Sequence, residues 1–136
     1  MLAPKRQKYR KQFRGSWRKL AIKGANLNFG SFGLKTLETG WIKDREIESA
    51  RIVLARATRK SGKFWIRIFP DKPFTKKPPE VTMGAGKGDV SHFVASVVPG
   101  RVLFEIDGLD EVEAKRVLHN VAAKLSVNTK FVTKNI

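Results

Sequence analysis

Apolar residues recur at spacings of three and four in two stretches of the chain, and this period predicts two helices. The apolar face of the first helix, over residues 44–60, consists of Ile47, Ala50, Leu54 and Ala57. The apolar face of the second helix, over residues 110–125, consists of Ala114, Val117, Leu118, Val121, Ala122 and Leu125. Asp110 and Glu113 resemble a capping box at the start of the second helix. We therefore expect both helices to bury one face in a shared core.

Alternating apolar and polar residues predict strands between the helices. Residues 34–42 follow a glycine turn at 30–33 and supply one or two short strands. In residues 64–69, one face holds Phe64, Ile66 and Ile68, and the other holds Trp65, Arg67 and Phe69. We expect this segment to cover the core with its first face and to expose its second face.

Further strands are predicted on both sides of the second helix. Residues 90–98 and 101–106 favour a hairpin around Pro99–Gly100, because proline presets one turn torsion and glycine allows a positive one. A last strand is expected over 128–134. Strands interrupted by two helices indicate an α+β fold, with a mixed, largely antiparallel sheet.

Residues 70–88 break the alternation with prolines and glycines, at Pro70, Pro73, Pro78, Pro79, Gly84, Gly86 and Gly88. A loop of this length in a compact domain is either functional or disordered. We expect a single α+β domain over residues 31–136 that carries this loop at 70–88, preceded by a basic arm over residues 1–30.

Positive charge is concentrated in the first two-thirds of the chain, whose formal net charge is +16. Residues 1–88 hold 22 basic and 6 acidic residues, whereas residues 89–136 hold six of each. Segregated positive charge is typical of a protein that binds a polyanion. Ten Lys or Arg precede the first carboxylate, Glu38, and the aromatic residues among them, which can stack on bases, are Tyr9, Phe13, Trp17, Phe29 and Phe32. We expect the arm to be disordered alone and to order on RNA, with its aromatic side chains stacking on bases.

The first helix carries a second set of cations on a face other than its apolar one, namely Arg45, Arg56, Arg59 and Lys60. Such a stripe is often merely solvated. Because this stripe accompanies an arm without carboxylates, we interpret it as a second RNA-binding surface.

The sequence offers little for catalysis, and we expect no catalytic residue, metal or cofactor. Cysteine is absent, which excludes disulfides and thiolate metal sites. The glycine-rich stretch around Lys87 lacks a phosphate-loop motif, because Val81 stands where a glycine is required and Gly88 where Ser or Thr is required. The cluster Glu105, Asp107, Asp110, Glu111 and Glu113 is best interpreted as carboxylates at a helix N-terminus.

Two other classes of function stay open as alternatives. An enzyme acting on nucleic acid or nucleotides would need a metal cluster at Glu105, Asp107 and Asp110. A free-standing DNA-binding or membrane-surface protein would need a recognition helix or a basic amphipathic helix, and neither pattern is present. No apolar run approaches the roughly 20 residues that span a bilayer, and the first residues do not resemble a secretory signal.

Several motifs together resemble the universal large-subunit ribosomal protein sixteen family, in its bacterial form. The matching stretches are Met1-Leu2-x-Pro4-Lys5-Arg6-x-Lys8-x-Arg10-Lys11, Phe29-Gly30-Ser31-Phe32-Gly33-Leu34-Lys35, Arg45-Glu46-Ile47-Glu48-x-Ala50-Arg51, Gly62-Lys63-x-Trp65-Ile66-Arg67-Ile68-Phe69-Pro70-Asp71-Lys72-Pro73, Met83-Gly84-x-Gly86-Lys87-Gly88 and Pro99-Gly100-Arg101-Val102-Leu103-Phe104-Glu105-Ile106-Asp107-Gly108. They cover nearly the whole chain in order and spacing.

The resemblance implies a structural constituent of the large ribosomal subunit that is not an enzyme. It implies binding to large-subunit, 23S-type rRNA and to neighbouring large-subunit proteins, in the bacterial cytoplasm or, as an alternative, in an organelle. It also implies a position near the peptidyl transferase region, close to A-site tRNA, with P-site tRNA as an alternative neighbour.

The site residues follow from the charge pattern and the resemblance together. The expected rRNA-binding residues are Lys5, Arg6, Lys8, Arg10, Lys11, Arg14, Arg18, Lys35, Arg45, Arg56 and Arg59. The expected tRNA-proximal loop residues are Thr82, Met83, Gly84, Gly86, Lys87 and Gly88. Ser16-Trp17, Thr82 and Ala85 depart from the more basic residues usual in the family, so we expect this loop to be less basic than usual.

Overall fold

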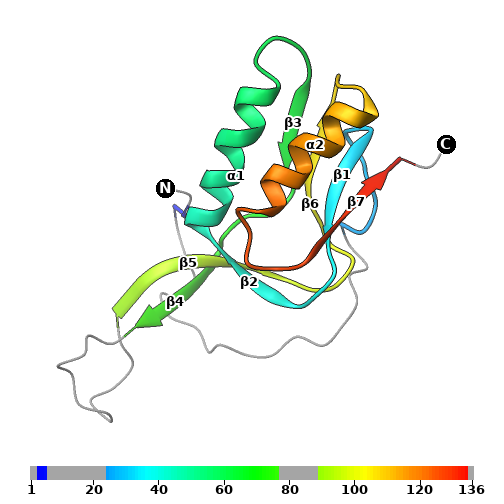
Figure 1. Cartoon of the computed structure of the whole chain (residues 1–136). Coiled ribbons are helices and arrows are strands. Elements are labelled where there is room, and N and C mark those ends of the chain that lie inside the picture. The colour runs from blue at the N-terminus through cyan, green and yellow to red at the C-terminus, as the bar shows by residue number, and fades with distance from the viewer. Residues whose placement is uncertain (1–2, 6–23, 77–88, 135–136) are drawn as a thin grey trace.

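The computed structural model describes residues 3–5, 24–76 and 89–134 of the chain (Figure 1). The elements, in chain order, are β1 (Phe32–Thr36), β2 (Gly40–Lys43), α1 (Asp44–Ala57), β3 (Lys63–Ile66), β4 (Lys72–Lys76), β5 (Asp89–Val97), β6 (Val102–Asp107), α2 (Glu111–Ala122) and β7 (Thr129–Thr133). The predicted α+β class and both predicted helices are confirmed. Within the described residues, no helix combines the length and the apolar character that crossing a bilayer requires.

The strands form two sheets rather than one. The larger sheet has the order β3-β6-β1-β7, and the smaller one has the order β2-β5-β4. Every strand pairing in both sheets is antiparallel. In Figure 1 the two helices cover one face of the larger sheet, and the smaller sheet extends away from them as a ribbon.

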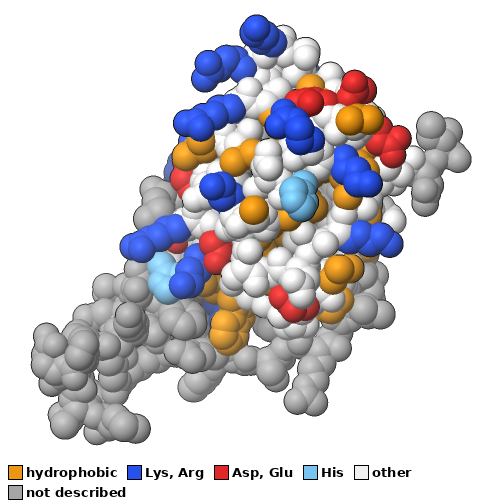
Figure 2. Space-filling view, in the orientation of Figure 1, with side chains coloured by type: hydrophobic (Ala, Val, Ile, Leu, Met, Phe, Trp, Pro, Cys, Tyr) orange, Lys and Arg blue, Asp and Glu red, His pale blue; other side chains and the backbone are white. Residues whose placement is uncertain are grey.

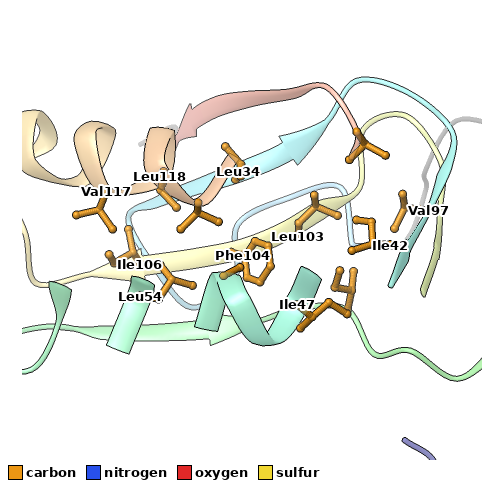
Figure 3. Close-up of a cluster of buried hydrophobic side chains, with 14 of the residues drawn as sticks. Leu34, Ile42, Ile47, Leu54, Val97, Leu103, Phe104, Ile106, Val117 and Leu118 are labelled. Carbon is orange, nitrogen blue, oxygen red and sulfur yellow. The ribbon is translucent and has the colours of Figure 1, made fainter. Parts of the chain in front are cut away.

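The core lies between the two helices and the larger sheet. Figure 3 shows Ile47 and Leu54 of α1 and Leu118 of α2 reaching toward Phe104 of β6, and all four side chains are buried. Every residue from Val102 to Ile106 is fully buried. Strand residues point alternately to opposite faces, so β6 must be covered on the face away from the helices as well.

Both helices begin near the predicted residues and end earlier than predicted, with α2 ending at Ala122 rather than at residue 125. Asp110 caps α2 as expected, because its carboxylate accepts from the Glu113 N–H at 2.8 Å. The first helix ends at Ala57 rather than at residue 60. Thr58 is its C-cap residue, and both the Thr58 N–H and the Thr58 hydroxyl donate to the Leu54 carbonyl, at 3.0 and 2.8 Å. The following strand is also shorter than predicted, ending at Ile66 rather than at residue 69.

The predicted hairpin of residues 90–98 and 101–106 is wrong. β5 pairs with β2 and β4, whereas β6 pairs with β1 and β3. The Pro99–Gly100 turn is present, and Gly100 has the positive φ of 93° that the sequence predicts. However, the turn meets the end of β1, where Gly100 and Arg101 exchange backbone hydrogen bonds with Thr36. Those bonds redirect the chain from one sheet into the other.

The first part of the segment predicted as a loop over residues 70–88 is a strand. β4 runs from Lys72 to Lys76 along the edge of the smaller sheet, with Pro73 opposite Phe93 of β5. An edge strand tolerates proline because one of its sides carries no ladder hydrogen bonds. Lys76 pairs with Asp89, so residues 77–88, which lie outside the described residues, connect two neighbouring strands.

Candidate nucleic-acid interface

The last residues of the predicted arm belong to the folded domain. We call residues 24–30 the arm root. The Gly24 carbonyl accepts from the Val102 N–H at 2.7 Å, and a Cβ added to Gly33 would lie 2.4 Å from the Leu27 side chain. The arm root therefore lies against β1 and β6. In the rest of the arm only residues 3–5 are described, and Arg6, Lys8, Arg10, Lys11, Arg14 and Arg18 lie outside the described residues.

The Glu105 carboxylate fixes the arm root. Its Oε1 accepts backbone hydrogen bonds from Asn28, Phe29 and Gly30, at 3.0, 2.9 and 2.9 Å. Its Oε2 pairs with the guanidinium of Arg67, and the Glu105 side chain is fully buried. Three successive N–H groups around one anion form a backbone nest, which here encloses an internal carboxylate. This bonding explains why a charged residue occupies the otherwise apolar, fully buried run from Val102 to Ile106.

Ionisation of Glu105 is favoured despite its burial. Burial alone raises the pKa of a carboxyl group, and it is the largest single influence at Glu105. The N–H groups of Gly30 and Phe29 and the Arg67 guanidinium together outweigh burial and hold the pKa of Glu105 below its ordinary value. Glu105 is therefore a structural anion rather than a candidate acid for catalysis.

Arg67 connects the arm root to β3 and β6. Its guanidinium donates to the Asn26 carbonyl at 3.3 Å and lies 5.3 Å from the centroid of the Phe29 ring. Phe29 in turn stacks on Trp65 with ring centroids 5.8 Å apart. Trp65 and Arg67 thus share the outer face that their alternation predicts.

Two aromatic residues expected to stack on bases make contacts within the protein instead. Phe29 stacks on Trp65, and Phe32 stacks on Phe131 of β7 with ring centroids 5.8 Å apart. Phe29 nevertheless stays 55% exposed. Of these two rings, the Phe29 ring is therefore the one that a partner can still contact.

The acidic cluster does not converge on a metal site. Glu105 holds the arm root, Asp107 accepts from the Ser31 hydroxyl and the Gly108 N–H, and Asp110 caps α2. Among the described residues, no group of three His, Asp or Glu side chains could hold a metal ion. The interpretation of the whole cluster as carboxylates at a helix N-terminus is also wrong, because Glu105 serves the arm root.

The cations of α1 fall into paired and unpaired groups. Arg51 binds Glu48 with an Nη2–Oε1 distance of 2.5 Å. By contrast, the exposed side chains of Arg45, Arg56 and Arg59 form no ion pair within the described part of the chain. Arg45 and Arg56 are eleven residues apart, which is about three helical turns, so they project from nearly the same face. Phosphates can therefore reach Arg45 and Arg56 of α1, and Arg59 just after its end.

Lys and Arg side chains are spread over the helical face of the molecule, with apolar side chains between them (Figure 2). A cavity of about 500 Å³ opens between the helices. Its lining includes Arg56 of α1 and Arg116, Asn120 and Lys124 on or just after α2. The sequence pattern missed the α2 side of this surface, because its cations stand among acidic residues; Arg116 itself binds Glu113.

The remaining site residues are distributed as follows. Lys5 is exposed, and Lys35 is partly buried in β1. Thr82, Met83, Gly84, Gly86, Lys87 and Gly88 lie outside the described residues. Their two flanking strands are described, and Lys72 of β4 lies 5.3 Å from the Trp41 ring of β2, across the smaller sheet. The structure therefore describes the base of the loop and not the loop.

Comparisons with known proteins agree with the motif pattern. Residues 4–132 match the model of the family described as ribosomal protein L16p/L10e. The chain is 54% identical over 134 residues to large ribosomal subunit protein uL16 of Mesorhizobium japonicum, covering 98% of each chain. It is 51% identical over 135 residues to the protein of the same name from Karelsulcia muelleri, covering 99% of each chain. A fold whose buried carboxylate is structural and a match over nearly the whole length lead to one conclusion: the chain belongs to the ribosomal protein L16p/L10e family and is a structural ribosomal protein, not an enzyme.

Proposed function

We propose that the chain is a constituent of the large ribosomal subunit that binds 23S-type rRNA and lies close to A-site tRNA near the peptidyl transferase region. The observation that carries the proposal is the segregated charge, 22 basic against 6 acidic residues over residues 1–88. The names and high identity of the relatives support the subunit assignment. The other partners are neighbouring large-subunit proteins, and the location is the ribosome of the bacterial cytoplasm.

The rRNA contacts are mainly to phosphates and to the shape of the folded RNA. Lys5 and the arginines and lysines that follow it in the arm neutralise phosphates along one path. Arg45 and Arg56 do so from α1, where a packed helix fixes their backbone, and Arg59 does so from the residues just after that helix. Folded RNA offers few base edges that side chains can reach in its deep major groove. Cations on both the arm and a rigid helix can contact phosphates at separate positions, and this allows the protein to recognise a particular RNA shape.

The tRNA contact belongs to residues 82–88. The flanking strands, β4 and β5, pair up to Lys76 and Asp89, so the two described residues on either side of 77–88 lie opposite one another. Gly84, Gly86 and Gly88 let the backbone approach a bulky partner where a side chain would collide. Lys87 supplies one cation, since the family resemblance implies that Thr82 and Ala85 occupy positions that are usually basic.

Sedimentation of a cell lysate with immunodetection tests the subunit assignment. We expect the chain in the large-subunit, whole-ribosome and polysome fractions. Absence from all three fractions would contradict the proposal. The RNA contact is tested separately with purified protein and an rRNA fragment. Neutralising six to ten phosphates should lower the affinity by about 10³–10⁵-fold between 50 and 200 mM salt, whereas a flat response would remove the electrostatic basis.

A further inference from the structure

The face of the larger sheet opposite the helices carries a second group of cations beyond the arm. Phe32 and Phe131 pack toward the core, so Lys35 in β1 and Lys130 in β7 point to the opposite face by the alternation of strand residues. Lys134 follows β7, and its N–H donates to the Ser31 carbonyl at 2.9 Å, which fixes its backbone beside β1. Lys130 and Lys134 were not among the residues that the sequence singled out.

Lys35 and Lys130 are direct cross-strand partners in the β1–β7 pairing. Like charges directly opposite one another in an antiparallel pair destabilise the sheet. At the other edge of the same sheet, Lys63 of β3 is opposite Asp107 of β6, which is the favourable arrangement. The lysine pair therefore weakens the free protein unless an anion lies between the two ammonium groups.

A cavity of about 450 Å³ lies at this pair. Lys35, Lys130 and Lys134 line it together with Asn26 and Leu27 of the arm root, and we call it the lysine pocket. No carboxylate is present among its described lining residues. A water molecule takes about 30 Å³ of liquid volume, so the pocket has room for a phosphate group and several waters.

We propose that the lysine pocket binds a phosphate of the rRNA backbone, at the point where the basic arm leaves the folded domain. The proposal rests on the proposed function and adds a second RNA-facing side to the protein, opposite α1 and α2. Three lysines around one cavity supply up to nine N–H donors for an anion. If rRNA contacts both the helical face and the opposite face of the larger sheet, it encloses the domain and does not cover one face alone.

RNA is the occupant that the location favours. The pocket is bounded by the arm root, and the adjoining arm holds most of the chain's acid-free basic run. An RNA strand whose phosphates bind along the arm can therefore continue into the pocket, so one RNA molecule serves both sites. The rival occupant is an acidic segment of a neighbouring ribosomal protein, and the experiment below distinguishes the two.

The test compares the reactivity of lysines toward acetic anhydride in the full chain, alone and with a large-subunit rRNA fragment, read by mass spectrometry. We expect Lys35, Lys130 and Lys134 to become protected by the RNA alone, while Lys63 stays as reactive as before. Protection that appears only in the assembled subunit, and not with RNA alone, would assign the pocket to a protein neighbour and overturn the proposal. If the RNA binds but the pocket lysines stay reactive, the proposal for the lysine pocket fails and the proposed rRNA-binding function stands. If the RNA does not bind, the pocket proposal and the proposed function fail together.

A variant supplies a second readout. Lys130→Gln removes the like-charge pair, so it should raise the urea midpoint of unfolding of the free protein while weakening rRNA binding by about tenfold, equivalent to one lost charged contact. Lys63→Gln is the matched control, because it removes a lysine from the opposite edge strand of the same sheet, where its partner is Asp107. A Lys130→Gln chain that binds rRNA as tightly as the unaltered chain would overturn the proposal.

Discussion

The backbone N–H of Gly30 donates to Oε1 of Glu105 at 2.9 Å, although the two residues are 75 positions apart in the chain. This bond is the innermost of three that hold the arm root on β6. Its acceptor is ionised and buried, and its partner on the other oxygen is Arg67. One buried carboxylate therefore accepts three of the hydrogen bonds that hold the arm root on the domain.

Replacing that charge should destabilise the domain. Glu105→Gln keeps the size of the side chain but leaves the partly buried Arg67 guanidinium without its anion and weakens three backbone hydrogen bonds. We expect the free energy of unfolding to fall by about 3 kcal/mol, measured by urea denaturation of the free chain. Glu111→Gln, at an exposed position, should change it by less than about 0.5 kcal/mol. Equal effects of the two substitutions would mean that the arm root is not held by Glu105.

The same carboxylate predicts a pH dependence. The pKa of Glu105 lies below its ordinary value of 4.5, so its contribution to stability is complete above the unfolded-state pKa and is lost as the pH falls through the folded-state pKa. The difference in free energy of unfolding between the unaltered chain and Glu105→Gln should be constant near neutral pH and shrink below about pH 4.5. A difference that grows on acidification would show a raised pKa instead.

Gly30 should not tolerate a side chain. A Cβ at this position would lie 2.6 Å from the carbonyl oxygen of Ile106, which is backbone and cannot rotate away. We expect Gly30→Ala to lower the free energy of unfolding by about 1–3 kcal/mol. Ser49→Ala is the control, because Ser49 is exposed on α1 and alanine favours a helix. If Gly30→Ala and Ser49→Ala change the free energy of unfolding equally, the arm root does not approach β6 as closely as described.

Paired and unpaired arginines of α1 should differ in RNA binding. Arg56→Ala removes an exposed cation without an ion pair and should reduce the slope of log affinity against log salt by about one. Arg51→Ala removes a cation that Glu48 already neutralises and should leave the slope nearly unchanged. Titration of an rRNA fragment by filter binding at several salt concentrations measures both slopes. Identical slopes for the two variants would remove α1 from the proposed rRNA surface.

Residues 82–88 should act on tRNA and not on assembly. Lys87→Glu reverses the main cation of the loop, so we expect weaker A-site tRNA binding with normal incorporation into the large subunit. Thr82→Arg should strengthen tRNA binding. Reconstituted ribosomes give both quantities, subunit occupancy by mass spectrometry and tRNA binding by filter retention. Loss of incorporation with Lys87→Glu would make the loop an rRNA anchor, and no change in either quantity would make it a linker.

Period and alternation predicted the parts of the fold that follow from local sequence. The apolar faces of both helices lie in the core, because a three-and-four spacing aligns side chains along a helix. Trp65 and Arg67 share an outer face because strand residues alternate. The α+β class followed from the order of these elements.

The sequence pattern could not predict which strands pair when they are distant in the chain. β5 and β6 are consecutive strands with a turn between them, and nothing local shows that Gly100 and Arg101 bond to Thr36 instead. Glu105 looked like one member of an acidic cluster, because its partners at residues 28–30 are remote in the chain. The lysine pocket was missed for the same reason: Lys35 and Lys130 become neighbours only when β1 pairs with β7.

The pairing of an early segment with late strands has a consequence during synthesis. β1 has both of its neighbours, β6 and β7, in the last third of the chain, and Glu105 follows Gly30 by 75 residues. At translation rates of about 5–20 residues per second, those residues take about 4–15 s to emerge. During that interval the cationic arm has left the tunnel of the translating ribosome. The strands that hold the arm root have not yet emerged. A nascent chain of this protein therefore exposes its cationic arm to the surrounding solution before β6 and β7 can pair with β1.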